Sequence, residues 1–400
     1  MKLLLVADAF YPMRSSAAIL INDLARELYL QGHQVVILVP TAEINGQWQI
    51  NSFDEFRLVL IKTPKTKDMG YLRRVIAEAL SPFFIFPRFK LTPIIDEVFD
   101  GIIWYSPTIF LGPLVGMLKQ KFKCPAYLIL RDIFPDWALD LGLIKKGMPY
   151  FFLKYVEGYQ YKIANYIGIQ APGNFKYFDK KQYKQLRSKV QLLWNWTSGP
   201  NSTETCPVNL SKTNLAGKKI LIYAGNMGIA QDLVFIINLV ELYKNYDKIG
   251  FLFIGRGSEA AHLKFLVTEK EIRNILFLDE IDSHEMPLLY TQCSIGLVAL
   301  DVRHKANNIP GKFLSYMCSG LPVVARLNPG NDLVNLISEK KVGVSYTGSD
   351  ASEFKILVDD LLENIENDQD FSIRCKNLAC NLFSTKNAVE KITSSLEHKN

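Results

Sequence analysis

The sequence is poor in the residues that hold metals and disulfides. Its 400 residues include six cysteines and five histidines, with no Cys-x-x-Cys pair and no metal-like clustering of the two types. No Asp-x-Asp-like cluster or set of histidine and carboxylate ligands lies near the motifs described below. We therefore expect reduced thiols, no metal and no cofactor.

Export and membrane-spanning signals are also weak. An apolar run starts at Leu3, but Asp8 interrupts it too early for a secretory signal, so residues 2–7 are expected to form a β-strand. The uncharged stretch 101–118 contains Pro107 and Gly112, which favour a strand, a loop and a short helix over a transmembrane helix. We therefore expect a cytoplasmic protein.

Length and charge indicate two different domains. A chain of 400 residues exceeds the usual size of a single hydrophobic core. Residues 1–200 carry 25 lysines and arginines against 16 acidic residues, whereas residues 201–400 carry 21 against 24. A basic first half and a slightly acidic second half indicate that the two domains meet different surroundings.

Alternating strand and helix patterns open the chain. Residues 2–7, 17–31 and 35–39 have the patterns of a strand, a helix and a buried strand, which together predict a parallel sheet. The loop at residues 8–17 lacks the Gly-x-Gly-x-x-Gly pattern of dinucleotide-binding proteins. Its absence argues against a dinucleotide-dependent oxidoreductase.

The same alternation restarts in the second half. It begins at residues 219–223, after a polar stretch that is rich in turn-forming residues and lacks periodicity. The pattern predicts an α/β fold of two doubly wound, Rossmann-like domains. We place them at residues 1–200 and 218–375, with a linker at residues 201–217.

The densest motif is Asn-Asn-Ile-Pro-Gly-Lys-Phe-Leu-Ser-Tyr-Met-Cys-Ser-Gly-Leu-Pro-Val-Val, residues 307–324. Pro310 favours a helix that begins at Gly311, and Gly320 favours its end. A helix start presents unpaired N–H groups and the positive end of the helix dipole, and Lys312 adds a full charge. The motif predicts an anion site suited to phosphate. The alternative is an ordinary amphipathic helix with a solvated lysine.

This motif resembles the donor-binding helix of family 4 glycosyltransferases, in particular their bacterial polysaccharide and O-antigen branch. Two glycine turns, Gly-Asn-Met-Gly-Ile-Ala-Gln from residue 225 and Gly-Arg-Gly from residue 255, also resemble segments of that branch. The order of elements matches the family over nearly the whole chain. The resemblance implies the GT-B fold, with two domains facing across a cleft, and a last helix, residues 376–400, that returns to the first domain.

The resemblance also implies a donor site, with two departures from the family pattern. Ser15 and Ser16 stand where the family usually has a Gly-Gly pair. Asn307 and Ser315 stand where most members have two glutamates; Asn307 fits the O-antigen branch, whereas Ser315 would bond a ribose hydroxyl more weakly than a carboxylate does. The residues expected to bind the donor are Ser15, Ser16, Gly225, Asn226, Gln231, Arg256, Ile281, Asn307, Gly311, Lys312 and Ser315.

A carboxylate in the first half is the candidate base. Asp132 follows the strand at residues 126–130, and ligands of open α/β sheets lie beyond the carboxyl ends of strands. Its segment, Arg-Asp-Ile-Phe-Pro-Asp-Trp, resembles the Asp-Leu-Trp-Pro element of the same branch. Asp132 could orient the acceptor hydroxyl or take its proton. The alternative is a helix cap or turn carboxylate.

Three stretches of the first half combine cations with aromatic residues: residues 62–90, 145–162 and 176–189. Such a combination suits docking on an anionic membrane surface. Nucleic acid would attract the same charges, but no nucleic-acid module accompanies them, so we expect no nucleic acid partner. The alternative is a set of solvated helices over an aromatic core.

The implied reaction is transfer of a sugar from a nucleotide diphosphate to a hydroxyl acceptor, with Asp132 and Lys312 as catalytic residues and the UDP-sugar as co-substrate. The basic first half suits a lipid-linked acceptor at the inner face of the plasma membrane. The most similar members of the branch are L-fucosamine transferases of O-antigen assembly, which implies N-acetyl-L-fucosamine as the sugar. Two alternatives are a GT-B sugar-nucleotide 2-epimerase and a non-catalytic nucleotide-sugar-binding partner of a polysaccharide assembly complex.

Overall fold

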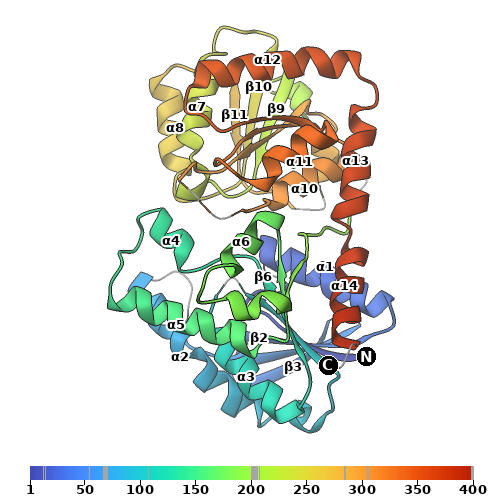
Figure 1. The fold of residues 1–400 in the computed structure, drawn as a ribbon. Coiled ribbons are helices and arrows are strands. Elements are labelled where there is room, and N and C mark those ends of the chain that lie inside the picture. Colours follow the sequence, from blue (N-terminus) through green and yellow to red (C-terminus); the bar gives the residue numbers. More distant parts are fainter. Residues whose placement is uncertain are drawn as a thin grey trace. The chain divides into compact units, whose positions relative to one another are not determined.

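The structure is a computed structural model, shown as a ribbon in Figure 1. It describes residues 1–11, 13, 15–53, 55–65, 71–106, 108–199, 206, 208–282, 285–303, 305 and 307–397. Pro107 and much of the predicted linker lie outside these residues. The chain divides into two compact units: unit 1 comprises residues 1–194 and 385–400, and unit 2 comprises residues 195–384.

Unit 1 is built on an eight-stranded sheet in the order β3-β4-β2-β1-β5-β6-β7-β8. All neighbouring strands pair in parallel except β3 and β4, which are antiparallel. The central strands β1, β5 and β6 are almost entirely buried, as expected for a parallel sheet covered on both faces. The strands are β1 (Lys2–Val6), β2 (Gln34–Thr41), β3 (Trp48–Phe53), β4 (Phe56–Lys62), β5 (Gly101–Ser106), β6 (Ala126–Leu130), β7 (Tyr166–Ile169) and β8 (Val190–Leu192).

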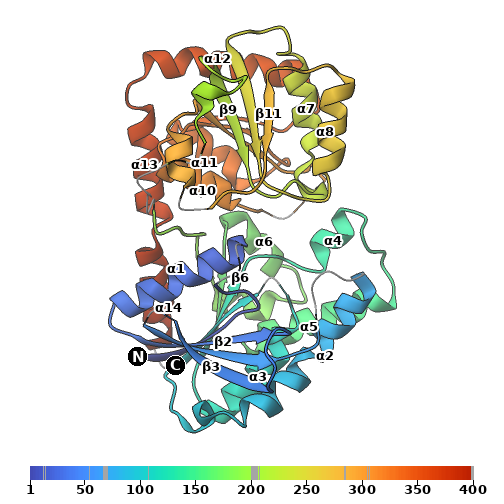
Figure 2. The ribbon, with the colours of Figure 1, turned by 180° about the vertical axis from the view of Figure 1, so that it is seen from behind.

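Helices of unit 1 follow the apolar periodicity of the sequence. In α1 the buried residues Ile21, Leu24 and Leu28 share one face, and the chain leaves the helix through Gly32 at φ +84°. The last helix, α14, packs beside α1, as both ribbon views show (Figures 1 and 2). The helices are α1 (Ser16–Leu30), α2 (Tyr71–Phe89), α3 (Leu111–Phe122), α4 (Asp136–Asp140), α5 (Met148–Ile163), α6 (Phe175–Phe178) and α14 (Thr385–Glu397), with 3₁₀ turns at Pro93–Asp96, Pro172–Asn174 and Lys184–Lys189.

Unit 2 contains a six-stranded, wholly parallel sheet in the order β11-β10-β9-β12-β13-β14. Its strands are β9 (Lys219–Ala224), β10 (Ile249–Ile254), β11 (Ile275–Leu278), β12 (Ile295–Ala299), β13 (Val323–Arg326) and β14 (Gly343–Tyr346). Its helices are α7 (Leu233–Glu241), α8 (Ala260–Glu269), α9 (Met286–Tyr290), α10 (Gly311–Cys318), α11 (Asp332–Lys340), α12 (Ala351–Asn367) and α13 (Phe371–Leu382), with 3₁₀ turns at Leu210–Lys212 and Ile229–Gln231.

Residues 101–106 form β5 and residues 111–118 belong to α3, so the predicted strand and helix are present. Gly112 lies inside α3, and Pro107 lies outside the described residues. Within the described residues, no helix combines the length and the apolar character needed to cross a bilayer. In both sheets the loops that follow parallel strands collect at one edge, and the predicted site residues lie on those loops or on the helices that follow them.

Candidate active site

The start of α10 carries a cation with no bonded partner. Pro310 occupies the N-cap position with extended backbone, and the helix begins at Gly311, beside which a Cβ would meet open space. The partly buried Lys312 lies with its Nζ 4.7 Å from the centre of the Tyr223 ring. It forms no hydrogen bond or ion pair with any described residue. Burial lowers the pKa of Lys312 to about 8. This cation is therefore available to an anion.

Tyr316 fixes α10 against the sheet. Its side chain lies where β9 and β12 separate, and its hydroxyl accepts from the Ala224 N–H (3.0 Å) and donates to the Ile222 carbonyl (3.0 Å). The ring fills the space above Gly296, where a Cβ would come within 2.4 Å of it. Sequence reasoning missed this role, because the strand gap that receives the hydroxyl is not visible in the motif.

Two glycine turns lie beside Lys312. A Cβ on Gly255 (φ +132°) would lie 2.2 Å from the Gly225 carbonyl oxygen, so glycine is required for the two loops to approach. The Met227 N–H donates to the Arg256 carbonyl (2.8 Å) and joins the loops. A Cβ on Gly225 would lie 3.6 Å from Cε of Lys312, so this turn faces the lysine. The predicted residues Gly225, Gly311 and Lys312 are thus brought together.

The amides of the first turn bond each other. Nδ2 of Asn226 donates to Oε1 of Gln231 (3.3 Å), which also accepts from the Gly228 N–H (3.1 Å). Arg256 forms an exposed ion pair with Glu280 (3.1 Å), just before the partly buried Ile281. These contacts shape the loops; donor binding by these residues stays a prediction.

Asn307 and Ser315 also have partners within unit 2. Oδ1 of Asn307 accepts from the backbone N–H of Asp332 (2.8 Å) and so caps the start of α11. The Ser315 hydroxyl donates to the Gly311 carbonyl one turn earlier in α10 (3.3 Å). Both residues flank the start of α10, and their contact with a donor is untested.

In unit 1, Ser15 and Ser16 begin α1, directly after β1 and its loop. Oγ of Ser15 accepts from the Ala18 N–H (3.3 Å), so Ser15 is the N-cap of the helix, and Ser16 is exposed. A helix cap therefore explains Ser15 locally, while the predicted donor contact of both serines is untested.

Asp132 follows β6 and is partly buried. It forms no hydrogen bond or ion pair with any described residue. Burial raises its pKa to about 6, against the opposing charge of Arg131. The N-cap of the next helix is Pro135, so Asp132 does not cap that helix, and the alternative of a turn carboxylate remains. Asp132 is therefore a desolvated carboxylate, and its role as a general base stays a prediction.

Neighbouring strand ends surround Asp132 with polar groups that the sequence did not single out. The buried Arg131 donates from Nη1 to the Leu193 carbonyl (2.9 Å), and burial lowers its pKa to about 10. Tyr105 at the end of β5 has its pKa raised by burial, with smaller contributions from Asp132 and Asp8. The carboxyl ends of β1, β5 and β6 therefore form one polar edge.

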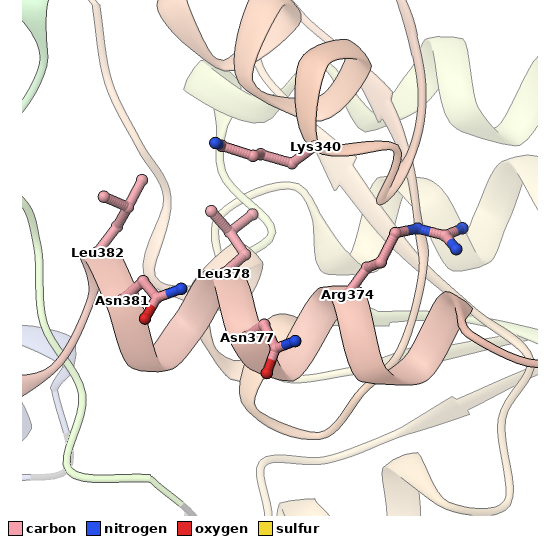
Figure 3. Close-up of a pocket in the computed structure, with 6 residues that line it drawn as sticks. All are labelled: Lys340, Arg374, Asn377, Leu378, Asn381 and Leu382. Atoms are coloured by element: carbon pink, nitrogen blue, oxygen red, sulfur yellow. The ribbon is translucent and has the colours of Figure 1, made fainter.

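A separate pocket lies on α13 and the end of α11 (Figure 3). Its lining residues are Lys340, Arg374, Asn377, Leu378, Asn381 and Leu382. Arg374 already forms an ion pair with Asp368 (2.6 Å). No predicted site residue lines this pocket, and we assign it no role in catalysis. Within the described part of the chain, no three His, Cys, Asp or Glu residues gather in a metal-binding arrangement.

Comparison with known proteins agrees with the fold. Residues 209–377 match the family model of Glycosyl transferases group 1. WbjE of Pseudomonas aeruginosa, named a probable glycosyltransferase, is 24% identical over 76% of this chain and 75% of its own length. WcaI of Escherichia coli K12, named for colanic acid biosynthesis, is 22% identical over 80% of this chain and 82% of its own. The Anabaena HepE structure, in complex with UDP and glucose, superposes with a TM-score of 0.67 at 12% identity over 100% of both chains.

These findings confirm the predicted GT-B fold and support a transferase over the two alternatives considered from the sequence. The residue-level assignments rest on the geometry of each unit.

Proposed function

We propose that this GT-B glycosyltransferase moves N-acetyl-L-fucosamine from a UDP-sugar to a lipid-linked saccharide during surface polysaccharide synthesis. The observation that carries the proposal is the partly buried Lys312 at the open N-terminus of α10, which forms no hydrogen bond or ion pair with any described residue. Such a cation, combined with unpaired helix N–H groups, suits a diphosphate that gains charge as it leaves.

In the proposed reaction, the acceptor hydroxyl oxygen forms a bond to the anomeric carbon of the sugar. The bond between that carbon and the diphosphate oxygen breaks, and UDP leaves with the electron pair. Lys312 and the α10 N–H groups stabilise the negative charge on UDP, while Asp132 accepts the hydroxyl proton. These protein groups supply the charge stabilisation, so the proposal includes no metal ion and no cofactor.

The comparisons support a UDP-sugar donor and a role in polysaccharide synthesis. HepE, which has a similar fold, binds UDP and glucose, and WcaI is named for synthesis of a surface polysaccharide. The sugar itself is inferred from the resemblance to L-fucosamine transferases.

A membrane partner is supported by two helices of unit 1. Val75 and Ala79 of α2 pack against the same apolar cluster as Leu153 and Val156 of α5. Each helix also exposes an apolar stripe at helical spacing. The exposed residues are Ile76, Leu80, Phe83 and Phe84 on α2, and Met148, Phe151, Phe152, Tyr155 and Tyr159 on α5.

The charges near these stripes favour an anionic bilayer as the occupant. Lys90, Lys145 and Lys146 are exposed beside the stripes. The carboxylate of Glu78 on α2 accepts a hydrogen bond from Thr108, and Glu157 on α5 is fully buried. Aromatic and aliphatic side chains flanked by cations suit the headgroup region of the inner membrane face.

The reaction is tested by UDP release from a panel of UDP-sugars, with and without a polyprenyl-diphosphate N-acetylglucosamine acceptor. We expect release that depends on both UDP-N-acetyl-L-fucosamine and the acceptor. Release with another UDP-sugar would correct the donor, and no release with any pair despite nucleotide binding would overturn the transferase proposal.

The membrane partner is tested by vesicle flotation. The double variant Phe83→Ser/Phe151→Ser should lose binding to phosphatidylglycerol-containing vesicles. Phe265→Ser removes a similarly exposed phenylalanine from α8 of unit 2 and should leave binding unchanged. Equal vesicle binding by both variants would exclude the exposed apolar stripes of α2 and α5 as the membrane-binding surface.

A further inference from the structure

The chain passes from unit 1 to unit 2 between Trp194 and Asn195. Asn195 is buried, and its Nδ2 donates to the carbonyl oxygen of Ile309 (2.8 Å). Ile309 is itself fully buried and stands two residues before Gly311, where α10 begins. The first residue of unit 2 thus holds the loop that leads into the proposed diphosphate site.

Two side-chain hydrogen bonds also join this loop to the start of α11. Oδ1 of Asn307 accepts from the Asp332 N–H (2.8 Å), and Nδ2 of Asn331 donates weakly to the Asn308 carbonyl (3.5 Å). Both of these bonds tie the loop to α11. The Asn195 bond is the one that ties it to the point where the chain enters the unit.

The residues after Asn195 are anchored as well. Trp196 is buried, and the Thr197 N–H donates to the Phe383 carbonyl (2.9 Å), next to the point where the chain leaves unit 2. The Phe383 ring packs edge-on against Phe313 of α10, with centroids 6.0 Å apart. The segments at both ends of unit 2 therefore contact α10 or the loop before it.

We infer that Asn195 is a positioning residue for the donor diphosphate. Its hydrogen bond to Ile309 fixes the loop before α10 relative to the point where the chain enters unit 2. This inference rests on the proposed function, because it assigns the start of α10 to the diphosphate. Loss of the Nδ2 donor leaves the buried Ile309 carbonyl without its partner, which favours movement of the loop. A displacement of the helix start weakens donor binding, because the N–H groups and Lys312 must converge on the same oxygens.

The experiment measures UDP affinity by titration calorimetry on the full chain. Asn195→Ala removes the side chain, and Asn195→Asp keeps its shape while replacing the donor with an acceptor. We expect both variants to bind UDP about tenfold more weakly, with a raised donor KM and an unchanged acceptor KM. Asn274→Ala is the matched control, because Asn274 is also buried in unit 2 and donates to the Tyr243 and Ile249 carbonyls.

Thermal unfolding separates a loss of fold stability from a loss of UDP affinity. All three variants should lose stability, but Asn274→Ala should keep the wild-type affinity for UDP. Wild-type UDP affinity in folded Asn195→Asp would overturn the inference while leaving the proposed function standing. Absence of UDP binding in the wild-type protein would overturn both.

Discussion

Asp132 in unit 1 and Lys312 in unit 2 carry opposite charges but have the same environment. Each is partly buried, and neither forms a hydrogen bond or ion pair with another described residue. Burial raises the pKa of Asp132 to about 6 and lowers that of Lys312 to about 8. In both cases desolvation disfavours the charged form. Within the described residues, each unit therefore holds one desolvated charge without a hydrogen bond or ion pair.

Two other buried charges have ion-pair partners. Glu157, which is wholly buried in unit 1, accepts from the hydroxyls of Tyr161 (3.0 Å) and Tyr183 (2.7 Å) and pairs with Lys154. In unit 2, Arg326 pairs with Asp232 (2.8 Å). The comparison leads us to predict that these ion pairs stabilise the fold, whereas Asp132 and Lys312 act in the proposed reaction.

The largest effect is expected from removing the base. Asp132→Asn keeps the shape but abolishes proton acceptance, so kcat should fall about 10³-fold with unchanged UDP affinity. Steady-state kinetics and calorimetry provide the measurements. Asp140→Asn, in the following helix α4, is the control and should retain activity. A kcat for Asp132→Asn close to that of the wild type would exclude the proposed role.

Lys312→Ala should lower kcat/KM about 10²-fold, because it removes charge stabilisation from the departing diphosphate. Unlike Asp132→Asn, it should also weaken UDP binding. The control is Lys340→Ala, which removes an exposed lysine of the α13 pocket in the same unit. Unchanged turnover of Lys312→Ala would contradict the proposed role of Lys312 in stabilising the departing diphosphate.

Removing a charge that takes part in a buried ion pair should lower stability but not kcat. Glu157→Gln disturbs Lys154 and three tyrosines in a buried site, so the free energy of unfolding should fall by about 3 kcal/mol. The folded fraction should keep its kcat. The exposed pair of Lys219 and Glu366 offers a control, since Glu366→Gln should cause no measurable change in urea unfolding. A stable but inactive Glu157→Gln would place this network in the reaction.

The pH profile of donor kcat/KM should show the titration of both Asp132 and Lys312. Its acid and alkaline limbs should each fall roughly tenfold per pH unit. Asp132 acts when ionised, so activity falls as the pH drops through its pKa of about 6. Lys312 acts when protonated, so activity falls as the pH rises through its pKa of about 8. Lys312→Arg should lose the alkaline limb alone, and an unchanged limb in that variant would assign it to another group.

Local sequence patterns predicted much of the fold and the positions of the candidate site residues in it. The helix that begins at Gly311 and the strand at residues 2–6 follow from proline, glycine and apolar spacing. The order of strands and glycine turns led to the GT-B fold. Local pattern does not tell which polar side chains will find partners, so it left Asp132 open between a cap and a base.

The sequence by itself determined the elements, their order and the types of residue at the strand ends, because these depend on neighbours in the chain. The tertiary structure decided which groups meet. Tyr316 reaches the Ala224 N–H across 92 residues, and Asn195 reaches Ile309 across 114. It also decided that Asp132 and Lys312 are desolvated without a hydrogen bond or ion pair to any described residue. Desolvation depends on atoms from distant segments, and only the folded chain brings those atoms together.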